Sequence, residues 1–373
     1  MWLTSSSVGR KFIMSLTGVC LVLFVTFHCL MNSVAILWPA AYNMVCEFLG
    51  ANWYALIASM GLALLFVIHI IYALCLTVKN RRARGNDRYA INGAAPGVEW
   101  SSKNMLVLGI VVVAFLIVHL IQFWAKMQLV EVCGCHTEIP AAAGTLFIHE
   151  AFSQVWTPIV YVIGFVALWF HLNHGFWSMF QSIGWDNTKW IPRLKCIGKW
   201  WTSIVILLFL AQVAVFTINA RNGKYLKDEG LRDQYAAMQI KHFTDVFGEG
   251  AANQGISYTQ LKQVTSQVVQ MPGMVFAQVT AQNPDLDVKD LAERFANLGK
   301  FINFLEGEKA IDTASLEEIV KSGALPQNPM MQMMQPQQAP QPEPQAEEVS
   351  PEQQEADNAP AQDGATNEES TNN

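Results

Sequence analysis

Five long apolar stretches in the N-terminal part of the chain constrain its fold more than any other feature. The hydrocarbon core of a bilayer is about 30 Å thick, and a helix needs roughly 20 apolar residues to cross it. Because lipid offers the backbone no hydrogen-bond partners, such stretches must be helical. We therefore predict an all-α membrane domain with five transmembrane helices, Phe12–Trp38, Trp53–Val78, Met105–Trp124, Val155–Phe180 and Trp200–Ile218.

Basic residues indicate how these spans are oriented. Short cytoplasmic loops of membrane proteins carry an excess of Lys and Arg. We therefore expect the N-terminus in the cytoplasm and the C-terminus on the outer face. The first stretch exceeds the roughly 7–15 residues of a signal-peptide core, so we expect it to be retained. The basic residues precede span one or lie between spans two and three and between spans four and five: Arg10, Lys11, Lys79, Arg81, Arg82, Arg84, Arg88, Lys103, Lys189, Arg193, Lys195 and Lys199.

Each of the first four spans contains one of four histidines, His28, His69, His119 and His171. An ionisable residue inside a span is costly and is by default a candidate functional residue. Haem iron takes axial imidazole ligands from facing helices of a bundle. Four histidines on four helices predict two bis-histidine haems, although any single histidine could instead hydrogen-bond a neighbouring helix.

The depth of each histidine groups the four into two pairs. At about 1.5 Å of rise per residue, His28 and His119 lie roughly 16 and 10 Å from the outer ends of their spans. His69 and His171 lie roughly 26 and 31 Å from the outer ends of theirs. A zinc or copper site would gather its ligands at one depth. The two depths therefore favour two haems, one in each half of the membrane.

The residues around the histidines resemble those of a known family. The first span contains Gly9-Arg-Lys-Phe-Ile-Met-Ser-Leu-Thr-Gly18 and then Phe27-His-Cys-Leu-Met-Asn32. The fourth contains Phe170-His-Leu-Asn-His-Gly-Phe-Trp-Ser178, followed by Ile183-Gly-Trp185. From Met1 to about Asn219 the chain resembles the di-haem cytochrome b membrane anchor of succinate dehydrogenase and fumarate reductase.

The resemblance implies an electron-transfer subunit. We do not expect the chain itself to bind succinate or fumarate, because no folded cytoplasmic segment is long enough to hold a flavin or dicarboxylate site. The resemblance implies a five-helix anchor with two haem b groups, one near each face, and a site for menaquinone. It also implies a flavoprotein subunit and an iron–sulfur subunit as partners, in the inner membrane of a bacterium. Menaquinone and the lipid bilayer complete the expected partners, and no nucleic acid is expected among them.

The resemblance also suggests which side chains lie near the haems. The ligand on helix four falls on His171. His174, one turn further on, is either a neighbour of a haem propionate or a hydrogen-bonded residue at the helix end. Arg10, Lys11 and Ser15, at the inner mouth of span one, are further candidates for propionate contacts. Positive-inside topology explains the two basic residues equally well.

Glu47 is the candidate acid of a quinone site. Some relatives have a Glu between helices one and two, and Glu47 is the only acid in that region here. A carboxylate there would accept the proton of the quinol, whereas the alternative is a solvated loop acid. Some relatives also carry a Glu two residues before the helix-four ligand. Trp169 stands at that position here, which argues against the same proton path.

Cys133-Gly-Cys135-His136 resembles a metal or haem motif but is incomplete. Covalent haem attachment requires Cys-x-x-Cys-His, and one His with two thiols does not complete a structural zinc site. We expect free thiols there, with a disulfide as the alternative.

The composition divides the chain into three parts. Residues 1–222 form the membrane domain, and residues 223–325 a helical extension. Residues 326–373, rich in Gln, Pro and Glu, bury too little apolar surface to fold and are expected to be disordered. The extension is expected to contain four helices, Leu226–Val246, Tyr258–Val269, Val288–Phe304 and Asp312–Val320.

Two other functions are compatible with the same residues. The chain could be the cytochrome b anchor of another membrane reductase, such as a nitrate reductase or a hydrogenase, which the co-purifying soluble subunits would reveal. It could also be a haem-free transporter or scaffold with buried histidines, which would be colourless.

Overall fold

A computed structural model describes residues 6–84, 99–134, 137–185, 187–248, 250, 255–307 and 309–325. Within these ranges every regular element is a helix, which confirms the all-α prediction. The described residues belong to one compact unit, Met1–Pro326. The expected disordered tail, 326–373, lies outside the described residues, as do Arg88, Cys135 and His136.

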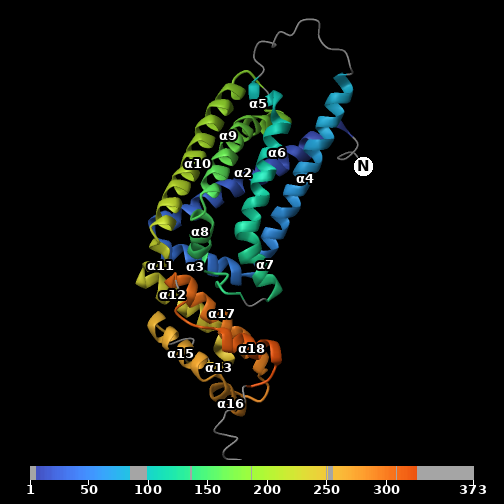
Figure 1. Cartoon of the computed structure of the whole chain (residues 1–373). Coiled ribbons are helices and arrows are strands. Elements are labelled where there is room, and N and C mark those ends of the chain that lie inside the picture. The colour runs from blue at the N-terminus through green and yellow to red at the C-terminus, as the bar shows by residue number, and fades with distance from the viewer. Residues whose placement is uncertain are drawn as a thin grey trace, which may run out of the picture. The chain divides into compact units, whose positions relative to one another are not determined.

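Five of the described helices are long and apolar enough to cross a membrane, as predicted (Figure 1). The last of them begins at Trp190 rather than at the predicted Trp200. Hydropathy marks only the apolar part of this helix, whereas its backbone continues through Lys195 and Lys199. The five are α2 (Ser7–Leu37), α4 (Trp53–Arg84), α6 (Met105–His119) continued by η1 (Leu120–Trp124) and α7 (Ala125–Cys133), α9 (Trp156–Ser182) and α10 (Trp190–Arg221).

The apolar surface of these helices supports a multi-pass membrane protein. The most apolar stretch of α4 has a mean hydropathy of 2.5, yet none of its residues is buried within the protein. A helix that is apolar all round is either enclosed in protein or surrounded by lipid. Since protein does not enclose α4, lipid is the medium that suits it.

Two shorter helices, α3 (Pro39–Ala51) and α8 (Gly144–Phe152), lie at one end of the long helices and were not predicted. Pro39 occupies the first turn of α3, where a missing N–H costs nothing. Gly144 lets α8 approach α3 closely, because a Cβ at this position would lie only 2.7 Å from the ring of Tyr42. The two helices form a platform beside the ends of α2 and α10.

The C-terminal extension packs on this platform (Figure 1), and buried polar groups join the two. The side-chain oxygen of Asn43 accepts hydrogen bonds from the backbone N–H and the hydroxyl of Thr145, and its amide donates to Gln234 at 3.0 Å. The Tyr235 hydroxyl lies 2.7 Å from that of Thr145. Buried polar groups need partners, so this network specifies how the extension sits on α3 and α8. Its described helices are α11 (Lys224–Lys227), α12 (Glu229–Ile240), η2 (Lys241–Phe243), α13 (Thr244–Phe247), α15 (Tyr258–Gln270), α16 (Pro272–Gln282), α17 (Val288–Glu306) and α18 (Ala314–Ser322).

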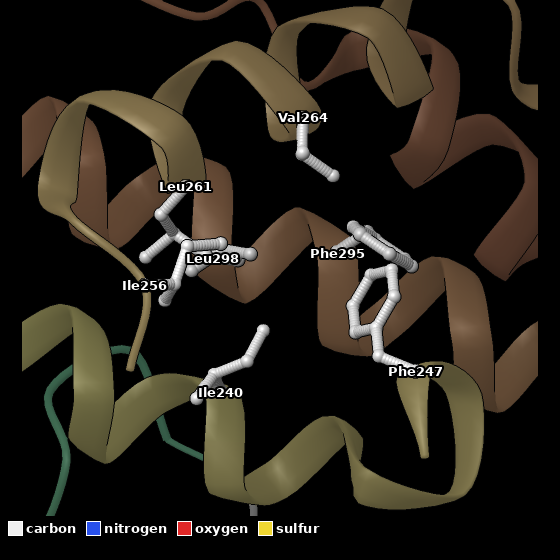
Figure 2. A pocket seen from close by; sticks show the side chains of 7 residues that line it. All are labelled: Ile240, Phe247, Ile256, Leu261, Val264, Phe295 and Leu298. Atoms are coloured by element: carbon white, nitrogen blue, oxygen red, sulfur yellow. The ribbon is translucent and has the colours of Figure 1, made fainter. Parts of the chain in front are cut away.

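The interior of the extension contains a small cavity of about 100 Å³ (Figure 2). Only apolar side chains line it, so it offers an ordered water no hydrogen-bond partner. We therefore regard it as a gap in the packing of the extension. Its lining residues are Ile240, Phe247, Ile256, Leu261, Val264, Phe295 and Leu298.

Candidate functional site

The histidines of α2 and α6 face each other. The ring centres of His28 and His119 are 5.7 Å apart, and the rings meet edge to face at 87°. Phe24 and Phe209 flank His28, while Phe115 and Phe123 flank His119. We call His28 and His119 the near pair, since both lie toward the helix ends that carry the extension.

The histidines of α4 and α9 form a second pair. The ring centres of His69 and His171 are 6.5 Å apart, with an angle of 61° between the rings. We call them the far pair. The structure thus brings the four histidines together in the same two couples as the estimate of depth, at two levels along the bundle.

Both ring separations suit a metal held between two imidazoles. A metal–nitrogen bond to imidazole is about 2.0–2.1 Å long, so two imidazoles that held one metal ion between them would have ring centres roughly 6 Å apart. Each pair would supply two imidazole ligands, and imidazole is a common ligand of haem iron. All four histidines are half-buried, so the neighbouring side chains do not cover the rings completely.

Glycines face both histidines of the far pair. A Cβ at Gly18 on α2 would lie 3.9 Å from the Cε1 atom of His69, and one at Gly109 on α6 would lie 3.8 Å from that of His171. A side chain longer than that of Ala would therefore extend into the space beside these rings. The two glycines keep α2 and α6 free of bulk where a planar ligand between the rings would need room.

Hydrogen bonds hold two of the histidines through their Nδ1 atoms. Nδ1 of His119 lies 3.1 Å from the hydroxyl of Tyr161, which donates to Oε1 of Gln122 at 3.0 Å. Nδ1 of His69 lies 3.0 Å from the hydroxyl of Thr17. Partners of this kind orient metal-binding imidazoles in proteins. In both residues Nε2 remains as the nitrogen available to a metal.

His28 and His171 have no such hydrogen bond described at Nδ1. The amide of Asn32 donates to the backbone oxygen of His28 at 2.8 Å and lies 3.2 Å from its Nε2 atom. A metal at this Nε2 would displace the Asn32 amide from the ring nitrogen and leave its hydrogen bond to the backbone oxygen of His28. The Nδ1 atom of His171 is buried and has no hydrogen-bond partner among the described residues.

Tyr42 holds Asn32 in place from the platform. Its hydroxyl donates to Oδ1 of Asn32 at 3.2 Å. Burial raises the pKa of Tyr42 well above its usual value, so the phenol keeps the proton that it donates. The near pair is therefore linked through Asn32 to α3.

The helix changes its winding directly after His119. Leu120–Trp124 forms one turn of π-helix between α6 and α7. Single π-turns are rare and occur frequently at functional sites. Gln122 lies in this turn and reaches both Tyr161 and the hydroxyl of Thr157, the latter at 3.2 Å.

The candidate propionate contacts lie apart from one another. His174 lies 3.5 Å from the carboxylate of Glu99, which also pairs with Lys195 at 2.9 Å. Burial alone would raise the pKa of Glu99, but the hydrogen bonds and charges of Lys195 and His174 outweigh it and lower that pKa. Ser15 donates to the backbone oxygen of Met179 at 2.7 Å.

The two basic candidates next to Ser15 lie in the first turns of α2. The side chain of Arg10 is half-buried, and that of Lys11 is exposed. Trp169, at the position where some relatives have an acid, donates through its indole N–H to Ser203 on α10 at 3.1 Å. It thereby joins α9 to α10.

Glu47 forms an ion pair with Lys241 of the extension rather than standing alone. Its side chain is 35% exposed, and it lies on α3. Cys133 is a free thiol, but the rest of its motif lies outside the described residues. Among those residues no cluster of three or more His, Cys, Asp or Glu side chains suits a metal ion.

Sequence reasoning missed the partners of the histidines, Thr17, Asn32 and Tyr161, and also Gln122, which accepts a hydrogen bond from Tyr161. One signal was available: polar residues are scarce in these spans, and Asn32 and Gln122 follow His28 and His119 by one helical turn. Comparisons with protein families, curated proteins and solved structures found no match.

Proposed function

We propose that the chain is the membrane-anchoring cytochrome b subunit of a succinate dehydrogenase or fumarate reductase. Its near and far pairs would hold one haem b each and carry electrons between menaquinone and an iron–sulfur subunit. A bis-histidine haem supplies reversible one-electron transfer. The observation that carries the proposal is the presence of two facing histidine pairs on four apolar helices, at two levels of one bundle.

The chain's own residues support this proposal in three ways. Two pairs at different levels suit electron transfer along the bundle, whereas one cluster would suit a single site. Thr17 and Tyr161 hold the Nδ1 atoms of His69 and His119 through the kind of hydrogen bond that metal-binding imidazoles usually make. Glycines leave room beside the far pair.

The geometry favours His171 over His174 as the ligand on α9. His171 faces His69, whereas His174 contacts Glu99 and the ring of Trp177. A pair of variants tests this choice in the purified full chain. We expect His171→Ala to lose one haem per chain and His174→Ala to keep both. Loss of a haem in His174→Ala alone would contradict the assignment.

The partner subunits rest on the resemblance alone and need their own test. A tagged full chain, expressed in its own organism and solubilised in mild detergent, should co-purify with a flavin-containing and an iron–sulfur subunit. Succinate or reduced quinone should then reduce the haems. Co-purification with a molybdenum- or nickel-containing subunit would instead identify the anchor of another reductase.

A further inference from the structure

We infer that Thr17 and Tyr161 are positioning residues that set the tautomer of His69 and His119 and lower the reduction potential of the group bound there. This inference rests on the proposed function, because it concerns a haem between the histidines. It is carried by the direction of the hydrogen bonds around each ring.

At the near pair, Tyr161 is an acceptor toward His119. A phenol has one hydrogen, and Tyr161 donates it to Oε1 of Gln122 at 3.0 Å. The Gln122 amide nitrogen donates to Thr157 at 3.2 Å, which turns Oε1 toward Tyr161. The 3.1 Å contact between Tyr161 and His119 must therefore be donated by the Nδ1–H of the imidazole.

At the far pair, Thr17 plays the same part. Its hydroxyl hydrogen goes to the backbone of its own helix, to the carbonyl oxygens of Ile13 and Met14 at 3.0 and 3.1 Å. Since the hydroxyl has no second hydrogen, the 3.0 Å contact with His69 is donated by the Nδ1–H of His69. Two unrelated residues on different helices thus select the same tautomer.

This tautomer leaves the lone pair on Nε2. In a neutral imidazole one nitrogen carries the hydrogen and the other carries the lone pair. His28 has the same tautomer for another reason, because the amide of Asn32 donates to its Nε2 atom. In three of the four histidines the lone pair that a metal would need is therefore on Nε2.

The hydrogen bond at Nδ1 also affects the metal. An acceptor there gives the imidazole more negative character and makes Nε2 a stronger donor. A stronger donor favours ferric over ferrous iron, and hydrogen bonding of the ligand is one of the means by which proteins adjust haem potentials. In each pair one histidine has this acceptor, His119 in the near pair and His69 in the far pair.

Isosteric variants test this inference in the purified full chain. Tyr161→Phe removes only the phenol oxygen, and Thr17→Val replaces only the hydroxyl by a methyl group. Thr17→Ser keeps the hydroxyl and is the matched control. Each variant is measured in a background that retains only one histidine pair. Tyr161→Phe is combined with His69→Ala, so that only the near pair remains. Each Thr17 variant is combined with His28→Ala, so that only the far pair remains. This arrangement assigns each optical redox titration to one site.

We expect Tyr161→Phe to shift the near-pair potential positive and Thr17→Val to shift the far-pair potential positive. Outer-shell partners typically change metal affinity or activity 10–100-fold, and a tenfold change in a one-electron equilibrium is about 59 mV. Thr17→Ser should keep the parent potential. Unchanged potentials in both Tyr161→Phe and Thr17→Val would overturn the inference while leaving the haems in place. A wild-type chain without haem would instead overturn the proposed function itself.

Discussion

The imidazole of His28 on α2 meets that of His119 on α6 edge to face, with 5.7 Å between the ring centres. These residues are far apart in the chain and lie on the first and third of the long helices, which run in the same direction. If the two rings hold one haem between them, replacing either histidine should remove that haem. His69 and His171 stand in the same relationship at the other level.

Double variants test this pairing. Removing both members of one pair should cost no more haem than removing one, because either loss empties the same site. We expect His28→Ala/His119→Ala to keep one haem per chain and His28→Ala/His69→Ala to keep none. Haem per polypeptide, measured after extraction, gives the result. A remaining haem in His28→Ala/His69→Ala, or none in His28→Ala/His119→Ala, would disprove the pairs.

Bulk added beside the far pair should remove its haem selectively. Gly109→Leu places a branched side chain where even a Cβ lies 3.8 Å from His171. We expect one haem to be lost and the near-pair haem to remain, as measured by absorbance per chain. Gly61→Leu is the control, since a Cβ at Gly61 meets nothing within 4 Å. Equal haem content in the two variants would show that the space beside His171 is not used.

Glu47 gives a prediction about quinone chemistry. If its carboxylate accepts the quinol proton, Glu47→Gln should slow quinol-dependent haem reduction roughly 100-fold or more. Lys241→Gln breaks the same ion pair but keeps the carboxylate, so we expect it to retain most of the rate. Stopped-flow reduction by a menaquinol analogue measures both. The same small effect in the two variants would limit Glu47 to attaching α3 to the extension.

Acid should lower the stability of the extension, because it protonates the carboxylate of Asp245. The hydrogen bonds of Arg294 lower the pKa of this carboxyl below its usual value. Its contribution to stability is therefore complete above the unfolded pKa of about 3.9 and disappears as pH falls through the lower folded pKa. Arg294 is nearly buried and holds Asp245 with two hydrogen bonds of 2.9 Å.

The matching variant is Asp245→Asn, with Asp285→Asn as a control outside this ion pair. Because the Asp245 side chain is 45% exposed, we expect Asp245→Asn to cost only about 1 kcal/mol at neutral pH. Hydrogen exchange of α13 and α17 at constant pH would show it as faster local opening. Identical exchange in the two variants would indicate that the ion pair contributes nothing.

The five spans and the two histidine couples could be predicted because both follow from the length and rise of apolar helices. The partners of the histidines could not be predicted, because Tyr161 and Thr17 contact them only when each helix has a particular rotation about its axis, and the sequence does not give that rotation. Two features of the extension were not expected from its sequence. No helix is predicted between Val269 and Val288, yet Pro272 begins α16. The predicted helix Leu226–Val246 is interrupted at Asp228, whose side chain caps α12.

The presence of haem tests the account most directly. The measurement is a dithionite-reduced minus oxidised spectrum of the purified full chain, with haem quantified per polypeptide. Two facing histidine pairs predict about two b-type haems per chain. One haem would contradict the assignment of one pair. A well-folded, colourless protein would contradict the cytochrome account altogether and favour a transporter or scaffold whose histidines serve only the packing of its helices.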